Sequence, residues 1–96
     1  MLDKSGRLII GLGLLERCKH ISIKSEVSVL YNQVNKFLVL KTKGIDSAPG
    51  MYYVASLKID EKGRIIMPSS VRKAFPEATY LPTEKDGEIY IFIITK

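Results

Sequence analysis

The sequence predicts a mostly β fold with two short helices, in which roughly seven short strands form a small barrel that closes by pairing of two halves. Three observations predict this class: runs of alternating apolar residues, a block that occurs twice, and turn-forming residues between the runs. The 96 residues suit one compact domain. Hydrophobic residues make up 46% of the chain and charged residues 26%, which is a globular composition.

The repeated block is Asp-x-x-Gly-Arg followed by three apolar residues. It covers residues 3–10 and, 57 positions later, residues 60–67. In each copy the glycine suits the positive φ of a tight turn, and the aspartate can accept hydrogen bonds from nearby backbone amides. The apolar triplet predicts a short buried strand. A short helix is expected after each copy, over residues 12–18 and 69–75.

The second helix has the clearer start. Pro68 ends the preceding strand and suits the beginning of a helix, Ser69 and Ser70 are candidate caps, and Pro76 ends the helix. In the first copy Gly11 stands at the position of Pro68, so the first helix has a weaker start signal.

Alternation of apolar and polar residues predicts the remaining strands. They cover residues 21–24, 27–30, 37–40, 51–59, 79–83 and 88–95. Residues 32–36 predict one hairpin turn, and Asp86-Gly87 is a strong signal for a two-residue turn between the last two strands.

The repeat divides the chain into two half-units. Residues 1–43 form a first, degenerate half-unit, since only Met1 and Leu2 precede its turn, and residues 51–96 form the second. Residues 44–50 contain Asp46, Ser47 and Pro49 and are the one linker-like stretch. The two half-units together are expected to form one compact domain.

The charge of the chain favours an anionic partner. The net charge is +5, of which the first 48 residues carry +4 and the remainder +1. A basic domain of this size suits nucleic acid, the commonest anionic partner.

Cysteine and histidine content excludes several classes of site. Cys18 is the one cysteine and His20 the one histidine, so neither an internal disulfide nor an ordinary His/Cys zinc site can form. We therefore expect an intracellular protein. The longest apolar run, residues 8–15, is too short to cross a membrane. We find no catalytic constellation, and expect no enzymatic activity, no cofactor and no metal.

The second half also resembles a known family. Residues 57–73 contain a strand, Asp-x-x-Gly-Arg, three apolar residues, a proline and a short helix with a basic pair. This pattern resembles the swapped-hairpin family of AbrB-, MazE- and SpoVT-type transcription regulators, over about residues 51–96. The tandem arrangement is similar to MraZ-type proteins. The resemblance implies an interleaved β-barrel in which two half-units exchange hairpins.

The resemblance further implies a sequence-specific, DNA-binding transcription regulator. Its DNA-contacting positions fall on Arg64, Arg72 and Lys73 in the second copy and on Arg7 in the first. Double-stranded DNA is the implied partner, a homo-oligomer the expected state, and the cytoplasm, at the nucleoid, the expected location.

The first copy departs from the pattern at its helix. Leu15 and Glu16 occupy the positions of Arg72 and Lys73, and Arg17 can replace them only in a shifted helix. We therefore expect that Arg64→Ala weakens DNA binding more than Arg7→Ala does.

Two other functions and a plainer role for the cations stand beside this hypothesis. One alternative hypothesis is that the chain is an antitoxin whose partner is a toxin protein, although we expect it to lack the tail segment with which antitoxins wrap the toxin. It is also alternatively a structural or oligomerising module that has lost DNA binding. The arginines of the Gly-Arg pairs then hold the turns through Asp3 and Asp60, and Arg72 and Lys73 form a solvated helix face.

Overall fold

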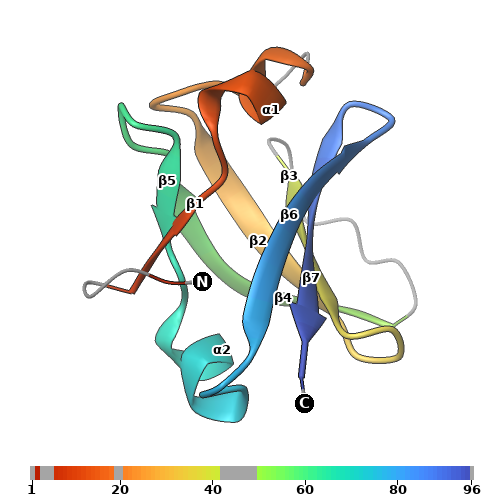
Figure 1. Cartoon of the computed structure of the whole chain (residues 1–96). Coiled ribbons are helices and arrows are strands. Elements are labelled where there is room, and N and C mark those ends of the chain that lie inside the picture. Colours follow the sequence, from red (N-terminus) through yellow and green to blue (C-terminus); the bar gives the residue numbers. More distant parts are fainter. Residues whose placement is uncertain (1, 3–5, 19–20, 42–49, 96) are drawn as a thin grey trace.

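The computed structural model describes residues 2, 6–18, 21–41 and 50–95 (Figure 1). Within these residues the fold is mostly β, with two short helices, as predicted. The elements in chain order are β1 (Arg7–Ile9), α1 (Leu12–Glu16), β2 (Glu26–Asn32), β3 (Phe37–Lys41), β4 (Met51–Lys58), β5 (Arg64–Ile66), α2 (Ser69–Ala74), β6 (Thr79–Lys85) and β7 (Glu88–Ile94).

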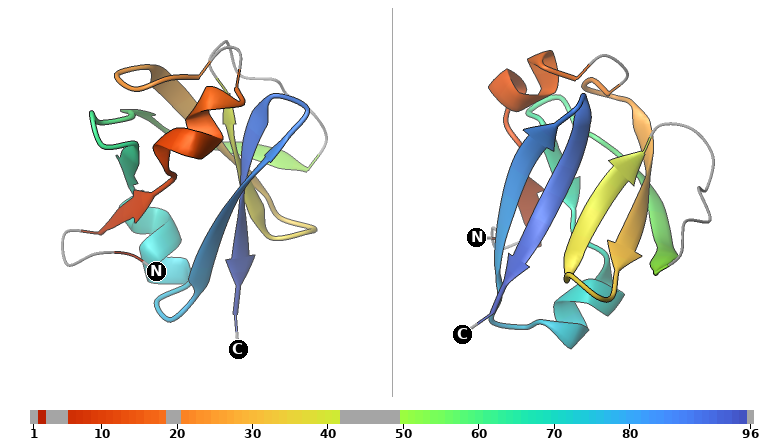
Figure 2. Two further views of the ribbon diagram at one scale, coloured as in Figure 1. Left: turned by 45° about the horizontal axis from the view of Figure 1, so that its top comes forward. Right: turned by 90° about the vertical axis from the view of Figure 1, so that its right-hand side faces the viewer.

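The strands form two antiparallel sheets. One has five strands in the order β4-β2-β3-β7-β6, and the other is the two-stranded ribbon of β1 and β5. Figure 2 shows the larger sheet curving around one side of the molecule, with the ribbon facing it. Leu8 and Ile65 of the ribbon belong to the same buried cluster as Leu38 and Ile91 of the sheet, so the core lies between the two layers.

The expected closed barrel is not formed. Within the described residues no strand pairing joins the ribbon to β4 or β6, the edge strands of the larger sheet. The ribbon strands have three residues each, and they close the core by packing their buried side chains on the sheet rather than by extending its hydrogen bonds.

The ribbon pairs the two copies of the repeat symmetrically. Leu8 lies opposite Ile65, the residue 57 positions later. At the two ends of the ribbon the Ile10 amide donates to the Gly63 carbonyl over 2.9 Å, and the Met67 amide donates to the Gly6 carbonyl over 2.9 Å. These two bonds join equivalent positions, so the ribbon has a local twofold axis.

A second symmetric pairing lies in the larger sheet. The β2–β3 hairpin and the β6–β7 hairpin meet along β3 and β7, with Val39 opposite Tyr90. Each half therefore contributes one strand to the ribbon and one hairpin to the sheet. The two halves share both layers rather than folding separately.

The strand expected at residues 21–24 is a turn. Lys24 has a φ of 67°, and the Ser25 amide donates to the Ser22 carbonyl over 3.1 Å. The Ser22 amide in turn donates to the Ser25 hydroxyl over 3.0 Å, a local bond that competes with strand pairing. The alternation of Ile21 and Ile23 was therefore misleading, since Ile21 is buried and Ile23 exposed in a turn.

Other local predictions have mixed outcomes. The two-residue turn is confirmed, because Asp86 and Gly87 have φ values of 54° and 81°. The serine caps are wrong: Pro68 is the N-cap residue of α2, and no side chain caps that helix. The Pro68 carbonyl accepts from the amides of Val71 and Arg72, so the helix begins one residue before the serines and both serines lie within its first turn. Residues 44–49 of the expected linker lie outside the described residues, as does Asp3.

The described helices have five and six residues, and neither is long enough to cross a membrane.

Comparing Gly63 with Gly87 separates the cost of a positive φ from the cost of a close contact. Gly63 has a φ of 74°, and a Cβ on it would lie 3.3 Å from Leu15 Cδ1 and 3.4 Å from the carbonyl carbon of Gly11. Gly87 has a φ of 81°, with nothing within 4 Å of such a Cβ. Positive φ costs an alanine about 1–2 kcal/mol.

We therefore expect Gly87→Ala to lower the free energy of unfolding by about 1–2 kcal/mol and Gly63→Ala to lower it by more, because only Gly63 adds a close contact. Urea unfolding of both variants measures the difference. Equal losses would mean that α1 does not pack on the Gly63 turn.

Candidate nucleic-acid interface

The outward face of the β1–β5 ribbon carries two arginines and two isoleucines. Side chains alternate along each strand, so Leu8 and Ile65 point into the core while their neighbours face out. Ile9 is 60% exposed and Ile66 is 55% exposed. Arg7 lies opposite Ile66, and Arg64 lies opposite Ile9. This exposure of Ile9 and Ile66 differs from the prediction that the whole apolar triplet is buried.

The pairing register sets the spacing of the two arginines. Arg7 and Arg64 are diagonal neighbours across the antiparallel pair, and such positions lie about 7–8 Å apart. The local twofold axis of the ribbon relates them. A two-stranded ribbon has dimensions that the major groove of B-DNA admits.

Asp60 organises the turn that precedes Arg64. Its Oδ1 accepts hydrogen bonds from the backbone amides of Lys62 and Arg64, both over 2.9 Å. Its Oδ2 accepts a bond of 2.8 Å from Arg64 Nε, and the Arg64 side chain is 22% exposed. The plainer role predicted for this arginine, holding the turn, is therefore present in the structure.

The same bonds change the acidity of Asp60. Burial raises the pKa of this carboxyl, but hydrogen bonds from the backbone and side chain of Arg64 and from the Lys62 amide lower it by more. Its pKa therefore lies below the ordinary aspartate value.

The helices pack crosswise on the two turns. Arg72 of the second half lies against Gly6 of the first half: a Cβ on that glycine would be 2.6 Å from Arg72 Nη1. Leu15, the equivalent of Arg72, packs in the same way on Gly63 of the second half. The structure thus brings Arg72 to the corner that leads into Arg7, not to the corner of Arg64.

The other predicted cations lie at the ends of the helices. Lys73 is exposed in the last turn of α2, and Arg17 is the exposed C-cap residue of α1. Figure 1 shows α1 and α2 at opposite ends of the molecule, with the ribbon between them. Arg17 and Lys73 are therefore not brought together, and each flanks the ribbon at a different end.

Comparison of the chain with protein-family models, with curated proteins and with solved structures returned no match.

The lowered pKa of Asp60 predicts a pH-dependent contribution to stability. Because the folded-state pKa is below the unfolded value of about 3.9, the stabilisation is complete above that pH and is lost as the pH falls through the folded-state pKa. Asp60→Asn should therefore destabilise the protein at pH 7, and the difference from the wild type should shrink below about pH 4.

Thermal unfolding between pH 7 and pH 2.5 measures this difference. Glu61→Gln is the matched control, since Glu61 is on the same turn and makes a 3.4 Å ion pair with Lys24 in which both side chains are largely exposed. A difference for Asp60→Asn that stays constant to pH 2.5 would contradict the role of the carboxylate.

Proposed function

We propose that this protein is a sequence-specific DNA-binding transcription regulator that inserts the β1–β5 ribbon into the major groove. One observation carries the proposal: Arg7 and Arg64 are related by a local twofold axis on the outward face of a two-stranded ribbon. Two arginines related by a twofold axis suit a DNA site with approximate palindromic symmetry.

The four outward residues supply different contacts in this proposal. The Arg7 and Arg64 guanidiniums donate to the O6 and N7 acceptors of guanine, the commonest specific contact in the major groove. The exposed Ile9 and Ile66 pack on thymine methyl groups, which also project into that groove. Each strand thus offers one arginine to contact guanine and one isoleucine to contact thymine.

Cations at the two ends of the molecule contact the phosphates. Arg72 and Lys73 on α2 and Arg17 at the end of α1 flank the ribbon, and such contacts gain free energy by releasing counterions from the DNA. They fix the register of the ribbon without reading sequence.

The resemblance to swapped-hairpin regulators supports this proposal through the crosswise contacts. Each helix packs on the turn of the other half, an arrangement suited to half-units that exchange hairpins. We extend the proposal to a homo-oligomer at the nucleoid in the cytoplasm, because one ribbon offers few phosphate contacts.

A second candidate function is a structural or oligomerising module. Two observations favour it: Asp60 engages Arg64 Nε over 2.8 Å, and Ile9 and Ile66 expose an apolar surface that suits contact with another protein. This candidate predicts self-association through the ribbon and no affinity for DNA.

The salt dependence of binding tests the phosphate contacts. Replacing Arg17, Arg72 and Lys73 together by alanine should weaken binding to every duplex tested and reduce the log–log salt slope by up to about 3 × 0.9. Lys85→Ala is the control, because Lys85 is a cation at the end of β6, outside both the ribbon and the two helices. Fluorescence anisotropy at several salt concentrations measures the slope, and an unchanged slope in the triple variant would contradict the phosphate contacts.

Single substitutions test the symmetry of the ribbon. The sequence predicted a larger loss from Arg64→Ala, but Arg72 lies at the corner of Arg7, so the helix cations do not favour the Arg64 side. We now expect comparable losses from Arg7→Ala and Arg64→Ala, measured as dissociation constants at one salt concentration in folded variants. A loss confined to one of them would show that only one half faces the DNA.

A further inference from the structure

The Asp60 carboxylate holds Arg64 at both ends of that residue. Oδ1 accepts from the Arg64 backbone amide over 2.9 Å, and Oδ2 accepts from Arg64 Nε over 2.8 Å. The two bonds close a ring that contains the Cα, Cβ, Cγ and Cδ atoms of the arginine. They therefore restrain the side-chain torsions and tie the guanidinium to the backbone of β5.

The backbone around this contact is held as well. The Asp60 amide donates to the Arg64 carbonyl over 2.9 Å, and the Gly63 amide donates to the Asp60 carbonyl over 3.1 Å. Ile59, which precedes the aspartate, is completely buried. The carboxylate is thus a fixed support for the arginine rather than a mobile surface charge.

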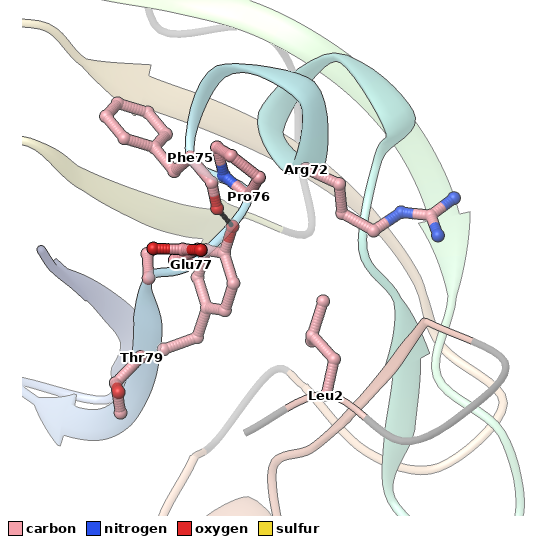
Figure 3. A pocket seen from close by; sticks show the side chains of 8 residues that line it. Leu2, Arg72, Phe75, Pro76, Glu77 and Thr79 are labelled. Carbon is pink, nitrogen blue, oxygen red and sulfur yellow. Dashed lines mark hydrogen bonds between the residues drawn. The ribbon is translucent and has the colours of Figure 1, made fainter.

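The helix residue beside this turn is apolar. A Cβ on Gly63 would lie 3.3 Å from Leu15 Cδ1, whereas at the other corner Arg72 lies against Gly6. Figure 3 shows Arg72 beside the cavity next to β6, with its side chain extending from α2 towards the ribbon. The two corners therefore differ: the helix brings a guanidinium to one turn and a leucine to the other, where the carboxylate engages Arg64.

An arginine that is ordered before it meets DNA favours a specific contact over a general one. A forked contact with O6 and N7 of guanine needs one orientation of the guanidinium, and a side chain already held loses less conformational entropy when the contact forms. A mobile arginine can instead follow any nearby phosphate, which gains affinity without reading the sequence.

The negative charge of Asp60 acts in the same direction. Its side chain is 36% exposed beside the arginine, so the carboxylate repels the phosphates that all duplexes share. It therefore lowers affinity for DNA in general while it supports the contact with one base.

We propose that Asp60 is a positioning residue that gives Arg64 its selectivity for guanine. The carboxylate engages Nε, so that the terminal nitrogens of the guanidinium make the contact with O6 and N7. This inference rests on the function proposed above and deepens it, because it names the residue that sets selectivity in one half of the ribbon. Asp3, the equivalent residue, lies outside the described part of the chain, so the inference concerns Arg64 alone.

Asp60→Asn separates this role from the folding of the turn. The Oδ1 of asparagine can still accept from the amides of Lys62 and Arg64, but its NH₂ group donates and cannot accept from Nε. Glu61→Gln is the matched control, because it removes one negative charge from the same turn and leaves the contact between Asp60 and Arg64 in place.

Selection from a random-sequence duplex library by the full wild-type chain supplies the probe. Each guanine of the enriched duplex is then replaced in turn by adenine, and the guanine whose replacement has no effect on Arg64→Ala is the one that Arg64 contacts. The wild type should prefer guanine there by about 5- to 150-fold. Asp60→Asn should lower this preference by at least about 5-fold, while its affinity for a mixed-sequence duplex stays equal or rises. Glu61→Gln should keep the full preference.

A double-mutant comparison shows whether Asp60 acts through Arg64. In the Arg64→Ala background Asp60→Asn should leave the preferences at all other positions unchanged. Thermal unfolding verifies that each variant is folded.

Two outcomes would overturn the positioning role and leave the proposed function intact. One is a guanine preference that survives Asp60→Asn. The other is equal weakening of the selected and the mixed-sequence duplex, which would mean that Asp60 only holds the turn. A wild-type chain that enriches no duplex would contradict the proposed function itself, and the inference with it.

Discussion

Antiparallel pairing of β1 with β5 joins the two halves of the chain, and the positions of both helices depend on it. The pairing places Leu8 opposite Ile65 in the core and ends in two equivalent backbone hydrogen bonds, to Gly6 and to Gly63. Because each strand leads directly into its helix, the ribbon also carries each helix across to the turn of the other half. A Cβ at Gly6 would lie 2.6 Å from the flexible end of Arg72 and one at Gly63 would lie 3.3 Å from Leu15 Cδ1, so glycine lets both helix residues approach these turns closely.

Different side chains at equivalent positions make the surface asymmetric, although the pairing is symmetric. The backbone is symmetric about the ribbon, but the helix residue that covers each turn is a cation in one half and an apolar residue in the other. The larger sheet is asymmetric too, because β4 covers the outer edge of β2 while the edge of β6 borders an open cavity and is interrupted by Pro82. Among the described residues, β2 is thus covered at its outer edge by a strand, and the turn at Gly6 is covered by a cation.

Much of the local structure could be predicted from the sequence, because it depends on neighbouring residues. Turn chemistry located the β6–β7 turn, and the repeat located both ribbon strands and both helices. The turn at residues 22–25 was missed because serine side chains and a contact with Ile59, 34 positions beyond Ser25, determine it. The exposure of Ile9 and Ile66 and the crosswise placement of Arg72 were missed for a related reason. The exposure depends on which face of the ribbon meets the sheet, and the placement of Arg72 depends on the pairing of β1 with β5. No local pattern of apolar residues specifies either.

Amide chemical-shift mapping with a mixed-sequence duplex at low salt tests the central claim most directly, because non-specific binding uses the same surface. The account predicts that the largest shifts fall on residues 7–9 and 64–66, in symmetric pairs, with smaller shifts at the ends of α1 and α2. Shifts concentrated in β3 and β7, or no shifts in a folded protein at low salt, would contradict the claim that the twofold ribbon is the DNA-reading element.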